Sequence, residues 1–270
     1  MPLLELPQPY DFEVSTERFR AFGVDLANLW HEGGLHRVVD GRELRIVPAP
    51  AGVEVEPLTN GDAPVVLTLL GATFDLASFY DFAQADPILA RLTRDLAGFR
   101  PPLAPDPFEA LVGSITAQQV SMYAAFAIRS RMIERFGKRA QHAWAFPTRE
   151  RVASAREEEL VALGFSRRKA EYVIALARSD LDFDELRTLS DEEVHARIVS
   201  LRGLGEWTAD WFLARYLGRP RAWPAGDLAL VKAVRGYYGD VNVRAFGDRF
   251  EPFQNLSAHY LLTGSRMVGT

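Results

Sequence analysis

The sequence predicts a mixed α+β protein in which an antiparallel sheet domain is followed by an all-helical bundle. The hydrophobic period changes near residue 75, from short β-rich runs to helical spacing. The 270 residues reach the size, roughly 250–300 residues, at which a single hydrophobic core stops growing. With 48% hydrophobic and 25% charged residues, the chain has enough apolar material to fold. These three observations together favour more than one folded domain.

We expect the sheet domain over residues 1–75. The runs LHRVVDG, ELRIVPA, GVEVEPL and APVVLTLLG are short and β-rich, and the turn signals DG, PAPAG and NGDAP separate them. One helix is expected on this sheet, in the segment STERFRAFGVDLANLW. There Ser15 is the expected N-cap, and Phe19, Phe22 and Leu26 have helical spacing.

Residues 76–105 are predicted to be connecting helices and a proline-rich linker, FRPPLAPDP, which is rigid because of its prolines. Residues 106–270 are predicted to be helical. One helix is expected to run from Pro107 to Gly137, because proline favours a helix start and glycine a helix end. Further helices are expected at about 148–163, 166–179, 190–199, 206–217 and 227–238.

Composition excludes several classes of function. The chain has no cysteine, which excludes disulfides, zinc thiolate sites, iron–sulfur clusters and cysteine nucleophiles. No basic segment precedes the short apolar run at the start, and no stretch reaches the ~20 apolar residues of a membrane span. We therefore expect a cytoplasmic protein with no membrane partner. The net charge of −5, taken alone, argues against a polyanionic partner.

The most informative segment is a glycine turn between two predicted helices. Leu201-Arg202-Gly203-Leu204-Gly205 has two glycines two residues apart, and a new helix begins directly after them. The N–H groups and positive dipole end of such a helix suit a phosphate oxygen. Considered alone, these residues are equally compatible with an ordinary turn between two helices.

The surrounding residues resemble a known family. The pattern Leu-x-Gly-Leu-Gly-x-x-Thr-Ala, followed 22 residues after Gly205 by Asp227 in WPAGDLAL, is similar to the helix-hairpin-helix motif and catalytic aspartate of the HhH-GPD superfamily of DNA glycosylases. The segments DPFEALVGSITAQQVS, FSRRKAEYVIALA and EPFQNLSAHYLL resemble other helices of that superfamily, in the same order. The nearest likeness is to the alkylpurine glycosylases of the AlkA type, or 3-methyladenine DNA glycosylase II. Their N-terminal sheet domain would account for residues 1–75.

The chemistry of the proposed reaction also points to Asp227. Cleaving an N-glycosidic bond builds positive charge on the sugar, and a fixed carboxylate beside C1′ stabilises that transition state. Asp227 could instead position or deprotonate the attacking water, and the sequence does not separate the two roles. As the alternative, Asp227 is only the N-cap of the helix that begins after it, a role compatible with catalysis.

Trp207 indicates the mechanistic class. By the resemblance, the bifunctional members of the superfamily carry at this position a lysine that forms a Schiff base with the sugar. The chain has only three lysines, Lys138, Lys169 and Lys232, and none lies on this helix. We expect a monofunctional hydrolase without AP-lyase activity. The absence of cysteine also excludes the branch of the family that carries an iron–sulfur cluster.

The resemblance implies roles for two tryptophans and two glutamines. Trp207 and Trp211 would face the base pocket, where an indole can stack on a positively charged alkylated base. Gln118 would also face the pocket. Gln119 would fill the gap left by the extruded nucleotide, since such an enzyme flips its target out of the stack. The alternatives are two core tryptophans and two surface glutamines in a helix.

The hairpin would supply the DNA contacts. Gly203, Gly205 and Thr208 are the expected contacts to phosphate, and Arg202 stands where the family usually has proline and could add another. Backbone carbonyls of Leu201 and Leu204 would hold a monovalent cation, and no other cofactor is expected.

Arg167, Arg168 and Lys169 open another helix, the less favourable end for cations, and either contact phosphate or form a solvated face. Residues 164–235 contain 12 basic and 11 acidic residues, so this region is nearly neutral and a modest salt dependence follows.

The sequence thus predicts a monomer, associated with the nucleoid, that removes alkylated bases from duplex DNA and leaves an abasic site. A glycosylase for oxidised or mismatched bases is the alternative among enzymes. The alternative that is not an enzyme is a noncatalytic helix-hairpin-helix module that binds distorted duplex DNA. Such a module has no need of Asp227.

Overall fold

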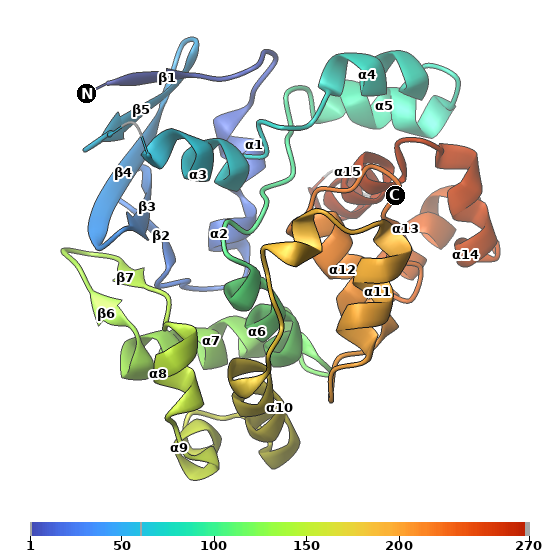
Figure 1. Cartoon of the computed structure of the whole chain (residues 1–270). Helices are drawn as coiled ribbons and strands as arrows, with labels where there is room; N and C mark the ends of the chain where they lie inside the picture. The colour runs from blue at the N-terminus through green and yellow to red at the C-terminus, as the bar shows by residue number, and fades with distance from the viewer. Residues whose placement is uncertain (1, 60, 268–270) are drawn as a thin grey trace.

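The computed structural model describes residues 2–59 and 61–267. A five-stranded sheet lies at one side of the molecule and helices make up the rest (Figure 1). Among the described residues, no helix is long and apolar enough to cross a membrane. The α+β class predicted from the sequence is confirmed.

The sheet is antiparallel throughout, in the order β1-β5-β4-β3-β2. Its strands are β1 (Leu3–Glu5), β2 (Asn28–His31), β3 (Gly34–Val39), β4 (Arg42–Ala49) and β5 (Gly52–Glu56). The predicted strands at β3, β4 and β5 are confirmed, and their alternating apolar residues, such as Leu44, Ile46 and Val55, are fully buried. The edge strands β1 and β2 were not predicted.

The prediction of a fourth strand, in the segment APVVLTLLG, is wrong. This segment forms α3 (Asp62–Leu69), which buries Val66 and Leu69 in the core under the sheet. The valines favour a strand, but one helical turn places Val66 and Leu69 on the same face, where they cover the sheet. Tertiary packing therefore overrides the local propensity.

The predicted helix beginning at Ser15 is also wrong in its bounds. The structure has two short helices, α1 (Phe12–Thr16) and α2 (Arg18–Ala21), and the N-cap is Asp11, which accepts the Val14 N–H at 2.9 Å. Ser15 is buried inside α1. Helix α2 ends at Ala21, and Gly23, with a φ of 110°, lies outside the helical region.

The predicted single helix over 107–137 is two helices, α6 (Pro107–Ala117) and α7 (Met122–Phe136). Gln119 has a φ of 53°, and Ser121 caps α7 by accepting the Ala124 N–H. A left-handed residue cannot continue a helix, so Gln118 and Gln119 lie in a break. The predicted helix at 148–163 is likewise two, α8 (Arg149–Ala153) and α9 (Glu157–Ala162).

The other predicted helices are confirmed within about two residues. They are α10 (Arg167–Arg178), α11 (Asp191–Val199), α12 (Glu206–Arg215) and α13 (Leu228–Tyr238). The remaining elements are α4 (Leu76–Ala83), α5 (Pro87–Asp95), β6 (Lys138–Arg139), β7 (Trp144–Ala145), the 3-10 helices η1 (Glu185–Arg187) and η2 (Gly247–Phe250), α14 (Val243–Phe246) and α15 (Gln254–Met267).

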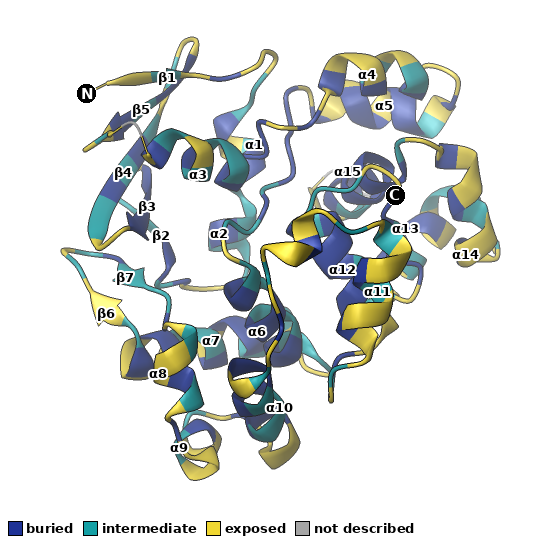
Figure 2. Cartoon of the chain, viewed as in Figure 1, coloured by how far each residue is buried: buried dark blue, intermediate teal, exposed yellow. Residues whose placement is uncertain are grey.

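Three hydrophobic cores hold these elements, and Figure 2 colours the buried residues of the ribbon dark blue. The first lies under the sheet, between Leu6 and Ala72 in sequence. The second joins α4 and α5 to the C-terminal helices α13 and α15, and the third lies among α6 to α12. The middle segment of the chain therefore packs against its C-terminal end.

A buried ion-pair network joins the sheet to the helices. Arg37 on β3 donates to Glu109 on α6 at 2.9 and 2.6 Å. Arg129 on α7 binds the same carboxylate at 2.5 Å and also contacts Asp25, which follows α2. This network fixes α2 and β3 against α6 and α7.

Candidate active site

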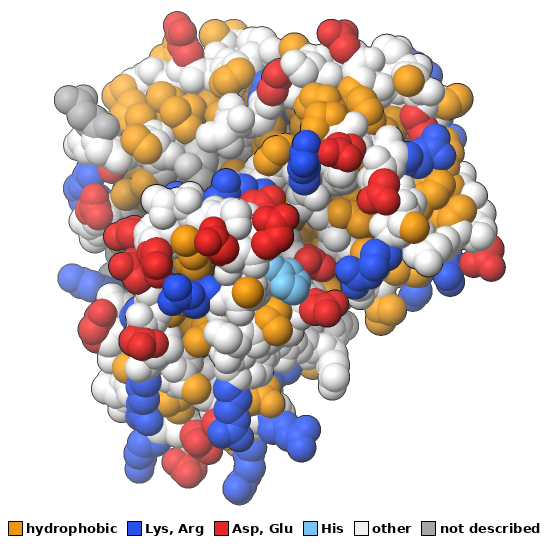
Figure 3. All heavy atoms as spheres, turned by 45° about the vertical axis from the view of Figure 1, so that its right-hand side comes forward, with side chains coloured by type: hydrophobic (Ala, Val, Ile, Leu, Met, Phe, Trp, Pro, Cys, Tyr) orange, Lys and Arg blue, Asp and Glu red, His pale blue; other side chains and the backbone are white. Residues whose placement is uncertain are grey.

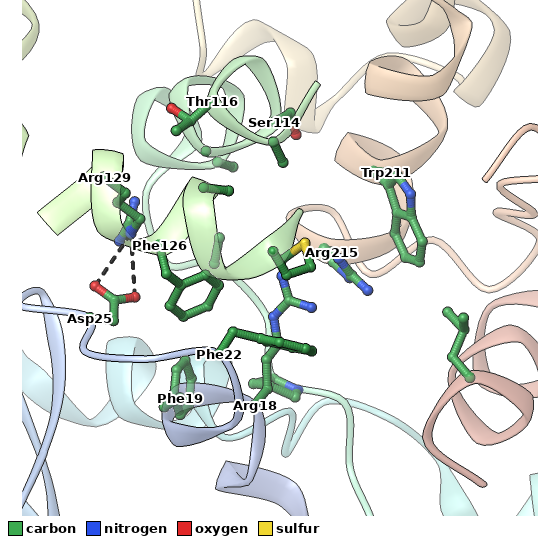
Figure 4. Close-up of a pocket in the computed structure, with 18 of the residues that line it drawn as sticks. Arg18, Phe19, Phe22, Asp25, Ser114, Thr116, Phe126, Arg129, Trp211 and Arg215 are labelled. Carbon is green, nitrogen blue, oxygen red and sulfur yellow. Dashed lines mark hydrogen bonds and ion pairs between the residues drawn. The ribbon is translucent and has the colours of Figure 1, made fainter. Parts of the chain in front are cut away.

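A cavity of about 510 Å³ lies where the sheet domain and the helices meet. Its wall is formed by side chains from α2, α6, α7, α12, α13 and α15, and Figure 4 shows many of them. Asp227, Trp207 and Trp211 belong to this wall. The cavity therefore collects side chains from both ends of the chain.

Asp227 is the N-cap of α13, and its two carboxylate oxygens have different partners. Oδ1 accepts the backbone N–H groups of Ala229 at 2.9 Å and Leu230 at 3.0 Å. Oδ2 accepts the indole N–H of Trp207 at 2.9 Å and of Trp211 at 3.0 Å. The cap thus orients the carboxylate, and the tryptophans hold its second oxygen in the cavity wall.

These donors keep Asp227 ionised. Burial alone raises the pKa of the carboxyl, but the Leu230 N–H, the two indole N–H groups and the charge of Arg215 outweigh it, so the pKa lies below its usual range. The site therefore holds a fixed negative charge at neutral pH, as required for stabilising a developing cation.

The two tryptophans are not equally available to stack on a base. The guanidinium of Arg215 lies 3.6 Å from the centre of the Trp211 ring, and Trp211 is only 4% exposed. Its ring already has a cation on one face, which leaves little surface for a base. Trp207 is half-buried, and of the two it is the one with surface left for the predicted stacking.

Gln118 does not line the cavity in this structure. Its amide Nε2 donates to the backbone oxygen of Gly203 at 2.9 Å. Because α6 ends at Ala117, the Gln118 side chain turns toward the hairpin and not along a helix face. It ties the break between α6 and α7 to the hairpin, which differs from the predicted contact with the base.

Gln119 lies exposed at the tip of this break, next to Val120, which is 39% exposed. Tyr123, the second residue of α7, is 66% exposed. Leu228, directly after Asp227, is 77% exposed. The exposed Gln119 is in a position compatible with the predicted gap-filling role.

The two hairpin glycines differ in their surroundings. Gly203 has a φ of 86°, and a Cβ there would meet Tyr172 at 2.1 Å, so only glycine fits. Gly205 is the N-cap of α12 and has open space where a Cβ would be. Within the described residues, the backbone N–H groups of Gly205, Glu206 and Trp207 have no hydrogen-bond acceptor. This end of α12 is therefore open to an anion.

Three of the predicted DNA contacts need correction or comment. Thr208 is 1% exposed and its N–H is bonded to the Gly205 oxygen, so its side chain cannot reach a phosphate. Lys169 is buried and its Nζ donates to the Thr116 oxygen at 2.9 Å, so it caps α6 instead. Arg202 is exposed and pairs with Glu171 at 2.7 Å. Arg167 and Arg168 remain exposed.

The sequence analysis missed the contribution of the sheet domain to this site. Arg18, Phe19 and Phe22, from α2 and the residue after it, line the cavity, and Arg215 lies opposite on α12 (Figure 4). The absence of a local motif explains the omission: α2 is a four-residue helix, and only folding brings Arg18 to α12.

The comparisons with known proteins agree with the fold. Residues 112–244 match the family described as HhH-GPD superfamily base excision DNA repair protein. The DNA-3-methyladenine glycosylase of Bacillus subtilis is 31% identical over 169 residues, which cover 60% of this chain and 56% of that protein. DNA-3-methyladenine glycosylase 2 of Escherichia coli is 29% identical over 177 residues, covering 62% and 61%. The match thus spans less than two thirds of either curated relative.

A solved structure covers more of the chain. The 3-methyladenine DNA-glycosylase from Archaeoglobus fulgidus superposes with a TM-score of 0.89 at 27% identity and covers 98% of both chains, including the sheet domain. The resemblance seen in the sequence is confirmed by the family match, the relatives and this structure. Residues 112–244, about half of the chain, thus carry the sequence of the HhH-GPD superfamily of base excision DNA repair proteins.

Proposed function

We propose that the protein hydrolyses the N-glycosidic bond of alkylated bases in duplex DNA, as a DNA-3-methyladenine glycosylase of type II, and leaves an abasic site. The observation that carries this proposal is the ionised carboxylate of Asp227, held by four N–H donors in the wall of a cavity large enough for a base.

The chemistry follows from that placement. As the glycosidic bond breaks, C1′ gains positive charge and the base leaves with the bonding electrons. A carboxylate fixed beside C1′ stabilises this charge without reorganising, and water adds to C1′ to complete the hydrolysis. The proton released by that water goes to solvent or to Asp227, and no redox cofactor is needed.

DNA would be held mainly through backbone N–H groups. The open N-terminus of α12 offers a phosphate site, and Gln119 would occupy the space of the flipped nucleotide. Figure 3 shows acidic and basic side chains mixed over one face, with basic side chains gathered at its lower end, the end that holds α9 and α10. This mixture supports binding through a few placed contacts and a modest salt dependence.

A monovalent cation at the hairpin belongs to the same proposal. The Leu201 oxygen accepts the Leu204 N–H at 3.1 Å, and no hydrogen bond to the Leu204 oxygen is found among the described residues. Since a carbonyl has two lone pairs, both oxygens can bind a cation. A cation there would add positive charge beside the phosphate. We further propose that the protein acts as a monomer on cytoplasmic, nucleoid-associated DNA.

An excision assay tests the function. Duplexes that each carry one alkylated, deaminated or oxidised base are incubated with wild type and with Asp227→Asn. The substitution removes the charge and leaves a good N-cap, so we expect a loss of at least about 10²-fold in the single-turnover rate with the fold retained. Asp210→Asn is the matched control, because Asp210 lies on α12 but does not line the cavity.

The outcomes separate the alternatives. Release of oxidised but not alkylated bases would favour the other enzyme class. If the protein binds damaged duplex DNA but releases no base, the result would support the noncatalytic DNA-binding module. Equal rates for Asp227→Asn and wild type would overturn the role of Asp227.

The same assay tests for a monofunctional mechanism. We propose that strands stay intact until alkali or heat is applied, because Trp207 replaces the Schiff-base lysine. Lys232 lines the cavity and is exposed, so it is the amine to examine if borohydride traps a covalent complex. Nicking that Lys232→Met abolishes would refute the monofunctional assignment.

A further inference from the structure

Gly113 lies inside α6 and borders the cavity. A glycine in a helix interior makes the helix less stable than an alanine does. A Cβ at this position would meet no atom of the described residues within 4 Å outside its own helix, so packing does not require the glycine. The residue is half-buried at the cavity wall. Gly113 therefore leaves room in the cavity that a larger side chain would fill.

Helix α7 forms the other side of this space. Arg129 on α7 donates to Glu109 on α6 at 2.5 Å, which fixes the two helices side by side. The chain reverses direction at the break between them, so Gly113 and Phe126, each about one turn nearer the break, lie at the same level. Both residues line the cavity. We call the space beside Gly113 and Phe126 the α6–α7 recess.

The recess is apolar. The Phe22 ring lies 5.7 Å from the Phe126 ring, and Met122 lines the cavity from the same helix as Phe126. The first charged residues along α6 and α7 from the recess, Glu109 and Arg129, are buried and bind each other. An alkyl group would be buried favourably in this recess, and the aromatic rings also attract a cationic base.

The recess lies across the cavity from the carboxylate of Asp227. That carboxylate precedes α13 and binds Trp207 and Trp211 on α12, whereas the recess belongs to α6 and α7. In Figure 4, Trp211 lies at one side of the view and Phe126 at the other. If C1′ lies beside Asp227, the far edge of the attached base points toward the recess.

The cavity is larger than a methylated base needs. At about 30 Å³ for each water-sized group, its volume of about 510 Å³ has room for roughly 17 such groups. The base 3-methyladenine has only eleven non-hydrogen atoms. Room therefore remains for a larger substituent on the base.

We propose that Gly113 determines the size of the alkyl group that the site accepts, because its missing side chain leaves the α6–α7 recess free for substituents larger than methyl. The inference rests on the proposed function and extends its substrate class to cationic purines with longer alkyl chains. It is compatible with 3-methyladenine, whose methyl group would only partly fill the recess.

Two substrates that differ only in the alkyl chain test this proposal. Single-turnover release of 3-methyladenine from methylated DNA is compared with release of 3-butyladenine from butylated DNA, for wild type, Gly113→Ala, Gly113→Leu and Gly236→Leu. Both bases leave as 3-alkyladenines, so the ratio of the two rates reports the effect of chain length. Gly236 is the matched control, because it also lies inside a helix, α13, but is exposed and does not line the cavity.

We expect wild type to release the butylated base within about tenfold of the rate for the methylated base, and Gly113→Leu to lower this ratio at least about tenfold further, as a few methylenes do in an apolar pocket. Gly113→Ala should lower the ratio less, and Gly236→Leu should leave it unchanged. An unchanged ratio in Gly113→Leu, or an equal fall in Gly236→Leu, would overturn the proposal. Where Gly113→Leu does not fold, an unchanged ratio in Gly113→Ala has the same meaning.

Two further measurements separate this proposal from folding and from the proposed function. Gly113→Ala should melt no lower than wild type, because alanine favours the helix and its Cβ has open space. A lower melting midpoint would show that packing requires the glycine and would overturn the proposal. If wild type releases 3-methyladenine but releases 3-butyladenine more than about tenfold more slowly, the inference fails and the glycosylase function stands. If wild type releases no base at all, the proposed function itself fails.

Discussion

At the scale of single residues, Asp227 shows that one carboxylate can cap a helix with one oxygen and hold the other in a cavity wall. Oδ1 caps α13 and Oδ2 accepts two indole N–H groups. The cap fixes the direction of the carboxylate, and the indoles stabilise its charge. Structural and catalytic roles for Asp227, which look like alternatives in the sequence, are compatible in the fold.

The lowered pKa of Asp227 predicts the pH dependence of activity. Because the folded pKa lies below the unfolded value of about 3.9, the group contributes stability above that value and loses it as pH falls through the folded pKa. We expect no loss of excision rate from Asp227 between pH 8 and 4.5. The measurement is a single-turnover rate profile over that range.

Asp210 provides the control for this profile, because burial raises the pKa of its carboxyl to about 6. A fall in rate near pH 6 that disappears in Asp210→Asn would belong to Asp210. A fall near pH 6 that persists in Asp210→Asn would contradict the ionised state assigned to Asp227.

At the scale of elements, the hairpin and the α6–α7 break act as one unit. Gln118 bonds the Gly203 oxygen, and Lys169 on α10 bonds the Thr116 oxygen at the end of α6. These two contacts fix the break, with Gln119 at its tip, against α10 and the hairpin. The α6–α7 break and the hairpin, which are the elements expected to contact DNA, therefore have fixed positions relative to each other.

The two hairpin glycines predict a large and a small loss of stability on substitution by alanine. Gly203→Ala should lower the free energy of unfolding by more than about 2 kcal/mol, because the new Cβ meets Tyr172 and φ is left-handed. Gly205→Ala should cost about 1 kcal/mol or less, since it loses only a favourable N-cap residue. Urea unfolding measures both changes.

Gly205→Ala also tests the phosphate site. Its Cβ would occupy the open space over the N-terminus of α12, so binding to a duplex with an abasic-site analogue should weaken severalfold. Unchanged binding, with the variant folded, would reject the phosphate contact at this glycine.

At the scale of the whole molecule, the sheet domain and the helices share one buried ion-pair network. Arg37 and Arg129 bind the Glu109 carboxylate from the two sides of the junction. Burial raises the pKa of Glu109, but the two arginines outweigh it and lower the pKa to about 2. The network also fixes α2, which carries Arg18 into the cavity.

This shift predicts acid sensitivity of the junction. Glu109 contributes its stability above its usual pKa of 4.5, and the contribution, about 3 kcal/mol for the full shift, disappears as pH falls toward 2. Glu109→Gln should lower the free energy of unfolding at pH 6 by about 3–5 kcal/mol, because two buried cations lose a partner. It should also weaken the pH dependence between 4.5 and 2.

Urea unfolding at pH 6, 4 and 3 checks this. Glu159→Gln is the control, because the Arg135–Glu159 pair lies at the surface, where solvent screens it, and its loss should change the stability little. Equal effects of the two substitutions would show that the Glu109 network does not hold the junction.

Local patterns account for the parts of the fold that the sequence predicts correctly. The strands β3 to β5 alternate at period two, and α10 to α13 have clear apolar stripes and starts such as the Ser190 capping box. The errors occur where distant contacts decide. The APVVLTLLG run becomes α3 because it covers a sheet, and the helix over 107–137 breaks where Gln118 reaches Gly203.

The sequence by itself determined the family, the hairpin and Asp227, because glycine spacing and helix capping act within one or two turns of backbone. The tertiary structure alone decided which side chains surround the cavity. It brought Arg18 from a four-residue helix to Arg215, and it turned Gln118 away from the cavity and covered Trp211. These contacts depend on how the three cores pack together, and no periodicity within a segment records that packing.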